Sequence, residues 1–259
     1  MLKKIQFAAR FLKYLLQAKT KTDSAFVNEL IEGVIKNDQQ FYAFKEIEGI
    51  RAALKKNHSK ISITDFGAGS NINNSNQRKI SDIAKHSAKM PHLGQMMFKL
   101  INKLQPIDML ELGTSLGISA CYQIAPNKNA NFTTMEGCPE TAKVAQKVFS
   151  NFNANGIKIT TGDFAKTLPE VLSSYSKLDY VFFDGNHQKE PTIDYFNKCL
   201  EIAHENTVFI FDDIHWSKGM EEAWEEIKSH PSVTITIDIF WVGFVFFKKD
   251  LKKSDYILR

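Results

Sequence analysis

The chain is 259 residues long, 43% hydrophobic and 24% charged, with a formal net charge of +4. This length allows a sizeable buried core, either in one medium domain with an added segment or in two small domains. The charge is too mild to indicate nucleic-acid binding, and three cysteines without CxxC spacing argue against a disulfide framework or a thiolate zinc site. No apolar run approaches the roughly 18 residues of a membrane span. The basic residues scattered through the first segment argue against a signal peptide, which needs a continuous apolar region. We therefore expect a cytoplasmic protein.

The segment 1–105 is predicted to form a helical N-terminal extension. A first helix is indicated by apolar residues that share one face, namely Ile5, Ala8, Ala9, Leu12, Leu15 and Leu16. Asp23 or Ser24 can cap a second helix, and residues 41–56 give the pattern of a third.

The remainder of this extension is predicted to be a loop followed by two helices. Residues 58–76 are rich in Gly, Ser and Asn, which is typical of loops. Helices are expected near 78–88 and 92–104, and Pro91 suits the start of the second because its fixed φ angle fits a first helical turn.

The segment 106–259 has a different rhythm. Short apolar runs alternate with helical patterns five times, the runs being IDMLEL, NFTTME, IKITTG, LDYVFFD and NTVFIFDD. This alternation predicts a parallel sheet wound by helices on both faces. The chain then closes with VTITIDIF and VGFVFF, which suit an antiparallel hairpin at the sheet edge. We therefore expect an α/β, Rossmann-like, doubly wound, seven-stranded sheet that is mostly parallel and ends in an antiparallel hairpin.

Two glycine-rich turns compete as ligand-binding sites. In a doubly wound sheet, ligands bind at the carboxyl ends of the strands, where a glycine turn allows close approach and a later acid can hold a ribose. The turn ELGTSLG follows the first strand, and Glu136 ends the next strand 19 residues after Gly117, close to the roughly 20 residues expected. The earlier turn, DFGAGS, has no second strand and no second acid after it. The later turn is therefore the predicted cofactor site.

The sequence ELGTSLGIS resembles motif I of class I S-adenosylmethionine-dependent methyltransferases, and in particular the O-methyltransferases of the catechol and caffeoyl-CoA type, with the pattern E-[LI]-G-x-x-x-G-x-S. TMEGCPETAKVAQ is similar to their second motif and TGDF to their third. The resemblance covers about residues 100–250.

This resemblance implies a site for S-adenosylmethionine. Glu111, Gly113 and Gly117 would line the methionine part, with Ser119 near its carboxylate, while Glu136 would hold both ribose hydroxyls. Asp163 would lie at the adenine edge. The full set implied for the cofactor is Glu111, Gly113, Thr114, Ser115, Gly117, Ser119, Glu136, Gly137, Gly162, Asp163 and Asp184.

Three further carboxylates are expected to converge above two neighbouring strands. Asp184 ends the fourth strand of the repeat, and Asp212 and Asp213 end the fifth. Carboxylate oxygens completed by water and substrate suit a hard cation such as Mg²⁺, which would lower the pKa of a bound hydroxyl. Acids at strand ends also cap following helices, and Asp213 is placed to cap a helix that starts near Ser217.

The catechol-type enzymes hold their metal with Asp on strand four and Asp-Asn on strand five. Here Asp184 and Asp212 match, while Asp213 replaces the Asn. In these enzymes a Lys three residues after the strand-four Asp serves as the base. His187 occupies that position here, and its imidazole titrates near neutral pH, so it can take the same role. We expect His187 to be the general base, with Asp184 as the second catalytic group and Lys189 and His215 as alternatives.

The extension invites two further interpretations. One concerns the turn with Asp65, Gly67, Gly69 and Ser70 and the residues Arg78, Lys79 and His86 that follow it. These residues could reach over the site and bind a polar acceptor. We favour the other interpretation, in which they are solvated turn and helix residues. The other concerns charge: residues 1–60 hold twelve Lys or Arg against six Asp or Glu. Within them, the segment 2–18 is expected to form a basic amphipathic helix. We expect its apolar face to pack on the protein, with contact to an anionic membrane surface as the alternative.

The sequence thus favours a methyltransferase, with magnesium-assisted O-methylation of a small hydroxylated molecule as the first hypothesis. The alternatives are a metal-independent N- or O-methyltransferase and a non-catalytic cofactor-binding partner protein. A nicotinamide-dependent oxidoreductase is disfavoured because the turn lacks GxGxxG. We expect a small-molecule methyl acceptor and no nucleic-acid partner, and a homodimer is compatible with the chain.

Overall fold

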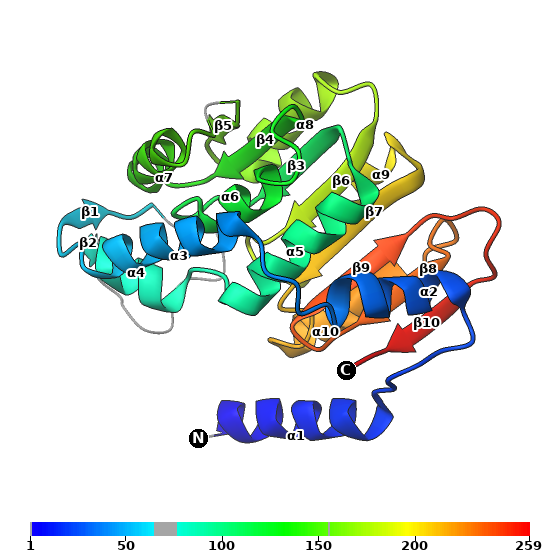
Figure 1. Cartoon of the computed structure of the whole chain (residues 1–259). Coiled ribbons are helices and arrows are strands. Elements are labelled where there is room, and N and C mark those ends of the chain that lie inside the picture. The colour runs from blue at the N-terminus through cyan, green and yellow to red at the C-terminus, as the bar shows by residue number, and fades with distance from the viewer. Residues whose placement is uncertain (1, 65–76, 155) are drawn as a thin grey trace.

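The computed structural model describes residues 2–64, 77–154 and 156–259, and its centre is a twisted sheet of eight strands (Figure 1). The strands are β3 (Asp108–Leu112), β4 (Asn131–Glu136), β5 (Lys158–Thr161), β6 (Leu178–Phe183), β7 (Ala203–Asp212), β8 (Ile235–Asp238), β9 (Val242–Phe246) and β10 (Ser254–Ile257). Their order is β10-β8-β9-β7-β6-β3-β4-β5. Strands β3 to β7 pair in parallel, and β9 is antiparallel to both β7 and β8. The predicted fold class, the five strand–helix repeats and the terminal hairpin are confirmed.

The predicted number of seven strands is wrong, because β10 adds an eighth. Its sequence SDYI is short, is preceded by charged residues, and pairs in parallel with β8. A four-residue segment of this kind is strand only because β8 offers an unpaired edge, so its own pattern carries little signal.

Two layers of helices cover the sheet and give two hydrophobic cores. One face packs against helices that precede β5 in the chain, namely α2 (Ala25–Leu30), the π-helical turn η1 (Ile31–Ile35), α3 (Tyr42–Lys55), α4 (Ile80–His86), α5 (Pro91–Leu104), α6 (Ile118–Ile124) and α7 (Pro139–Asn151). The other packs against α8 (Phe164–Ser173), α9 (Lys189–Leu200) and α10 (Lys218–Ser229). Alternate strand residues face alternate cores: Phe182 joins the first and Phe183 the second. Both faces are buried, which is why the strands read as continuous apolar runs.

The first helix, α1 (Leu2–Gln17), lies apart from the two helix layers, below α10 and β10 in Figure 1. Its aromatic side chains contact Phe240 in the link between β8 and β9. Phe7, Phe11 and Tyr14 surround Phe240, with ring centroids 4.8–5.3 Å apart. The hydroxyl of Tyr14 donates to the carbonyl of Leu258. Among the described residues, no helix has both the length and the hydropathy to cross a bilayer.

A small antiparallel sheet stands where the sequence indicated loop and helix. β1 (Lys60–Ser62) pairs with β2 (Gln77–Lys79), so Arg78 and Lys79 lie in a strand and the helix begins only at Ile80. Both strands are three residues long and polar, so neither shows a periodicity that would predict it. Asp65, Gly67, Gly69 and Ser70 lie outside the described residues.

Candidate active site

The sheet reverses its strand order between β3 and β6. From β3 the chain proceeds outward through β4 and β5, then returns to β6 and β7 on the other side. In open α/β sheets this reversal leaves a crevice at the carboxyl ends of the strands, where ligands bind. We call the ends of β3, β4 and β5 with their following turns the β3–β5 edge, and the ends of β6 and β7 the β6–β7 edge.

The glycine turn after β3 lies directly against the end of β6. Gly113 has φ +116°, and a Cβ there would lie 2.2 Å from the carbonyl oxygen of Asp184, so only glycine fits. Gly117 has φ +81° and precedes α6; a Cβ there would meet the ring of Phe149 at 2.6 Å. Gly113 therefore brings the two edges together, and Gly117 allows α7 to pack closely.

A buried chain of polar side chains lies beneath this turn. Glu111 is 0% exposed, and its carboxylate accepts hydrogen bonds from Gln123 Nε2 and Thr134 Oγ1, each at 2.6 Å. Thr134 also pairs with Thr114 at 2.6 Å. Burial raises the pKa of Glu111 to about 7, against hydrogen bonds from Thr134, Ser119 and Gln123 that lower it. In this structure Glu111 supports the turn from inside; its predicted contact with a cofactor stays a prediction.

Glu136, at the end of β4, binds two backbone N–H groups. Its Oε2 accepts from the N–H of Ser115 at 2.8 Å, and its Oε1 accepts from the N–H of Cys138 at 2.9 Å. The side chain is half-buried at the crevice, beside Gly137. A carboxylate oxygen can accept more than one hydrogen bond, so these two backbone contacts are compatible with further contacts to a vicinal diol.

The third acid of the β3–β5 edge is Asp163, which follows the left-handed Gly162 (φ +143°) after β5. Its carboxylate caps α8 by accepting from the N–H of Ala165 at 3.1 Å. The segment after β1 also reaches this edge, because the N–H of Thr64 lies 3.4 Å from the thiol sulfur of Cys138.

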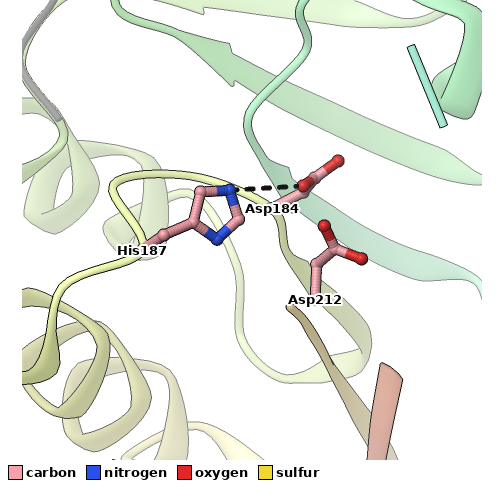
Figure 2. Close-up of side chains that lie close together, drawn as sticks. All are labelled: Asp184, His187 and Asp212. Atoms are coloured by element: carbon pink, nitrogen blue, oxygen red, sulfur yellow. Dashed lines mark ion pairs between the residues drawn. The ribbon is translucent and has the colours of Figure 1, made fainter. Parts of the chain in front are cut away.

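The β6–β7 edge brings together three residues that the sequence singled out. Figure 2 shows the imidazole of His187 directed at Asp184, with Asp212 beside them on the end of the next strand. His187 Nε2 lies 3.7 Å from Asp184 Oδ1. Ligand atoms of Asp184, His187 and Asp212 all lie within 4.8 Å of one another.

Asp213 is not part of this group, although the sequence analysis placed it among the metal ligands. Its backbone is left-handed (φ +56°), and its N–H donates to the carbonyl of Trp241 at 2.7 Å. Burial and the charge of Asp212 raise the pKa of Asp213 to about 7. The alternative of a helix cap is wrong, because the hydroxyl of Ser217 caps α10 by accepting from the N–H of Met220.

Lys89, which sequence reasoning missed, joins the two carboxylates. It lies between α4 and α5, and its ammonium donates to Asp184 Oδ1 at 3.1 Å and pairs with Asp212 Oδ2. Its side chain is 9% exposed. The ammonium also stands 5.4 Å from the ring centroid of Phe182, within the range of a cation–π contact.

The charges in this group are interdependent. Burial alone would lower the pKa of Lys89, but Asp184, Asp212 and Asp213 outweigh it and hold the pKa above its usual value. Burial and the neighbouring Asp212 raise the pKa of Asp184 well above its ordinary range. The pKa of Asp212 is lowered because Lys89 and hydrogen bonds outweigh burial. Lys89 and Asp212 are therefore held toward their charged forms, while the protonated form of Asp184 is favoured more than in a free carboxyl group.

His187 is set up to be neutral. Burial lowers its pKa below 6.5 even though Asp212 acts in the opposite direction. Asn186 and His187 both have left-handed backbones, with φ +70° and +47°. Left-handed backbones are uncommon outside glycine, although Asn and His adopt them more readily than most residues.

The two alternative bases are engaged elsewhere. Lys189 pairs with Glu222 and Glu226 of α10. His215 is held between Asp238 Oδ2 at 2.8 Å and Glu221 Oε1 at 3.3 Å, and neither partner belongs to the group at the β6–β7 edge.

The comparisons with known proteins agree with this geometry. Residues 110–214 match a family model described as a methyltransferase domain. This confirms the resemblance predicted from ELGTSLGIS and the predicted class of enzyme. The matched range begins in β3 and ends after β7, so it holds the glycine turn, Glu136 and the three residues of Figure 2.

Solved structures share the fold at low identity. An O-methyltransferase from Bacillus cereus in complex with SAH has a TM-score of 0.58 and 17% identity over 82% of this chain and 93% of its own. The SAH-bound methyltransferase PaMTH1 from Podospora anserina has a TM-score of 0.62 and 13% identity, over 90% of this chain and 99% of its own. The O-methyltransferase TomG from Streptomyces achromogenes, in complex with SAM, has a TM-score of 0.55 and 18% identity, over 62% of this chain and 82% of its own.

Proposed function

We propose that this chain, which contains a methyltransferase domain, transfers a methyl group from S-adenosylmethionine to an oxygen of a small hydroxylated molecule. One observation carries the proposal: the glycine turn and Glu136 on one edge of the sheet adjoin Asp184, His187 and Asp212 on the other, at the reversal of strand order. Cofactor and proton acceptor would thus stand on either side of one crevice.

We assign the cofactor to the β3–β5 edge. Glu136 is the group to hold the ribose hydroxyls, because its carboxylate is fixed by two backbone N–H groups and faces the crevice. Gly113 lets a ligand approach the backbone, and Asp163 and Gly162 stand at the outer end of the edge. The O-methyltransferases from Bacillus cereus and Streptomyces achromogenes were solved with SAH and SAM, which supports the same cofactor here.

We assign proton transfer to His187 at the β6–β7 edge. Its neutral imidazole can accept the proton of an acceptor hydroxyl, and Asp184 Oδ1 lies 3.7 Å from its Nε2. The cofactor supplies the electrophilic sulfonium methyl group. The protein's task is then to position the hydroxyl and to stabilise the negative charge that develops on its oxygen.

A resident divalent cation does not fit the arrangement of this edge. Asp184, His187 and Asp212 form a donor set of the right composition and spacing, but the ammonium of Lys89 already binds both carboxylates. The raised pKa of Asp184 also works against metal binding, because a metal ligand must be in the ionised form. We therefore route no step through Mg²⁺.

The division into an extension of residues 1–105 and a methyltransferase domain of residues 106–259 also stays a proposal. The extension supplies Lys89 to the site, and its helix α5 shares a hydrophobic core with the strands of the sheet. We propose that it encloses the acceptor side of the crevice.

The experiment that tests this function is methyl transfer from isotope-labelled S-adenosylmethionine to a panel of phenols, alcohols and amines, read by mass spectrometry. We expect labelled product with a hydroxyl acceptor and none with the amine-only members. Labelled product from amines alone would contradict O-methylation, and no product together with no SAH binding by calorimetry would contradict the methyltransferase site itself.

A further inference from the structure

Lys89 occupies the position at which the sequence predicted a metal ion. The residue precedes α5 in the N-terminal extension, 95 positions before its partner Asp184. Its side chain is 9% exposed and those of Asp184 and Asp212 are 15% and 5% exposed. A lysine buried to this degree needs a charged partner, and the two carboxylates provide it.

The two carboxylates already share a cation that belongs to the chain itself. The ammonium of Lys89 pairs with Asp212 and donates to Asp184 at 3.1 Å. A divalent ion between the same carboxylates would lie next to a fixed positive charge in a poorly solvated place, where the repulsion between like charges is strong.

The ammonium of Lys89 has more N–H donors than the two carboxylates use. It has three N–H groups, of which Asp184 and Asp212 take two. Within the described parts of the chain, no third acceptor binds the ammonium, and the ring centroid of Phe182 lies 5.4 Å from it. One N–H is therefore available to a ligand oxygen.

We propose that Lys89 is the built-in cation of this site, taking the place of a divalent metal and binding the acceptor oxygen during methyl transfer. This inference rests on the proposed function. As the acceptor oxygen forms its new O–CH₃ bond, the C–S bond of the donor breaks and its electron pair stays on sulfur, giving a neutral thioether. The hydroxyl proton passes to His187, while Lys89 keeps its proton and stabilises the developing oxyanion.

This arrangement sets a specificity that differs from metal chelation. A metal ion can bind two neighbouring hydroxyls at once, whereas one ammonium N–H binds a single oxygen. The site therefore accepts monohydroxylated molecules as readily as vicinal diols, and the number of hydroxyls does not decide turnover.

Titration with Mn²⁺, followed by electron paramagnetic resonance of the free ion, tests the inference without any need for activity. The wild-type protein should bind no Mn²⁺ at this edge at millimolar concentration, whereas Lys89→Met should bind it through the released carboxylates. Lys89→Met with Asp212→Asn should lose that binding again, and Lys85→Met, which changes an exposed lysine of α4, should behave as wild type. Saturable binding of Mn²⁺ by the wild type that Asp212→Asn abolishes would overturn the proposal, and this arm remains decisive should Lys89→Met fail to fold.

Methyl transfer gives the second arm. Wild-type turnover should be unchanged by EDTA, and Lys89→Met should lose about 10²- to 10³-fold in kcat with SAH binding retained. Turnover that EDTA abolishes and Mg²⁺ restores would overturn the role of Lys89 while leaving the proposed function intact. Absence of both turnover and SAH binding would instead overturn the proposed function, and the Mn²⁺ titration would still report on Lys89.

Discussion

The two edges of the crevice hold their carboxylates by different means. On the β3–β5 edge, Glu136 accepts from two backbone N–H groups and Glu111 accepts from the neutral side chains of Gln123 and Thr134. On the β6–β7 edge, Asp184 and Asp212 are bound by the ammonium of Lys89. The first arrangement places carboxylates on backbone and neutral donors, while the second places a positive charge beside two carboxylates. The difference matches the proposed division, with the cofactor on the first edge and proton transfer on the second.

The largest expected effect separates chemistry from binding. His187→Ala should lower kcat by about 10²- to 10⁴-fold, because it removes the group that accepts the acceptor's proton. SAH affinity, measured by calorimetry, should stay within a few-fold of wild type, since the residue belongs to the β6–β7 edge. His230→Gln, at the end of α10, is the matched control and should leave both quantities unchanged.

The pH profile sharpens this test. Burial lowers the pKa of His187 below 6.5, so the neutral, proton-accepting form is present at pH 7 and is lost as the pH falls. Wild-type kcat should therefore decline on the acid side at a pH below 6.5, and the residual activity of His187→Ala should lack this decline. A decline that persists unchanged in the variant would assign the base to another group.

The second effect concerns the stability of the β6–β7 edge. Asp212→Ala should lower the free energy of unfolding by about 3 kcal/mol, because it removes one of the two carboxylates that pair with the buried ammonium of Lys89. Adding Lys89→Met to this variant should recover part of the loss, which chemical denaturation of the two single variants and the double variant would measure. Strictly additive losses would show that Lys89 and Asp212 do not depend on each other.

A smaller effect is expected on the β3–β5 edge. Glu136→Gln should raise the dissociation constant of SAH by about 10- to 100-fold, since hydrogen bonds to a charged acceptor are replaced by weaker neutral ones. Glu140→Gln, on the exposed surface of α7, provides the control. Equal SAH affinity in all three proteins would remove the assignment of the ribose to Glu136.

The smallest effect tests the outer end of the same edge. Asp163→Ala should cost about 1 kcal/mol of stability through loss of the α8 cap, and its effect on SAH affinity should be weaker than that of Glu136→Gln. The comparison variant is Asp194→Ala, whose carboxylate pairs with Lys198 on the surface of α9. Thermal unfolding and SAH titration of both variants measure the two effects; a larger loss of affinity than in Glu136→Gln would move the main cofactor contact to Asp163.

The sheet from β3 to β9 could be predicted because each of its strands is an apolar run next to a helical pattern. Asp184, His187 and Asp212 could be predicted because they follow strands that the topology makes neighbours. β10 could not, since its pairing with β8 decides its structure. Lys89 could not either: it lies in a link between two helices, and its partners come from strands far along the chain. No local pattern distinguishes such a lysine from a solvated one.

A crystal structure of the wild-type protein grown with SAH and Mn²⁺ tests the central claim most directly. The account predicts SAH across the ends of β3, β4 and β5 with its ribose hydroxyls bound to Glu136, and the ammonium of Lys89 between Asp184 and Asp212 with no anomalous manganese signal there. A manganese ion bound by these two carboxylates, or SAH bound away from Glu136, would contradict it.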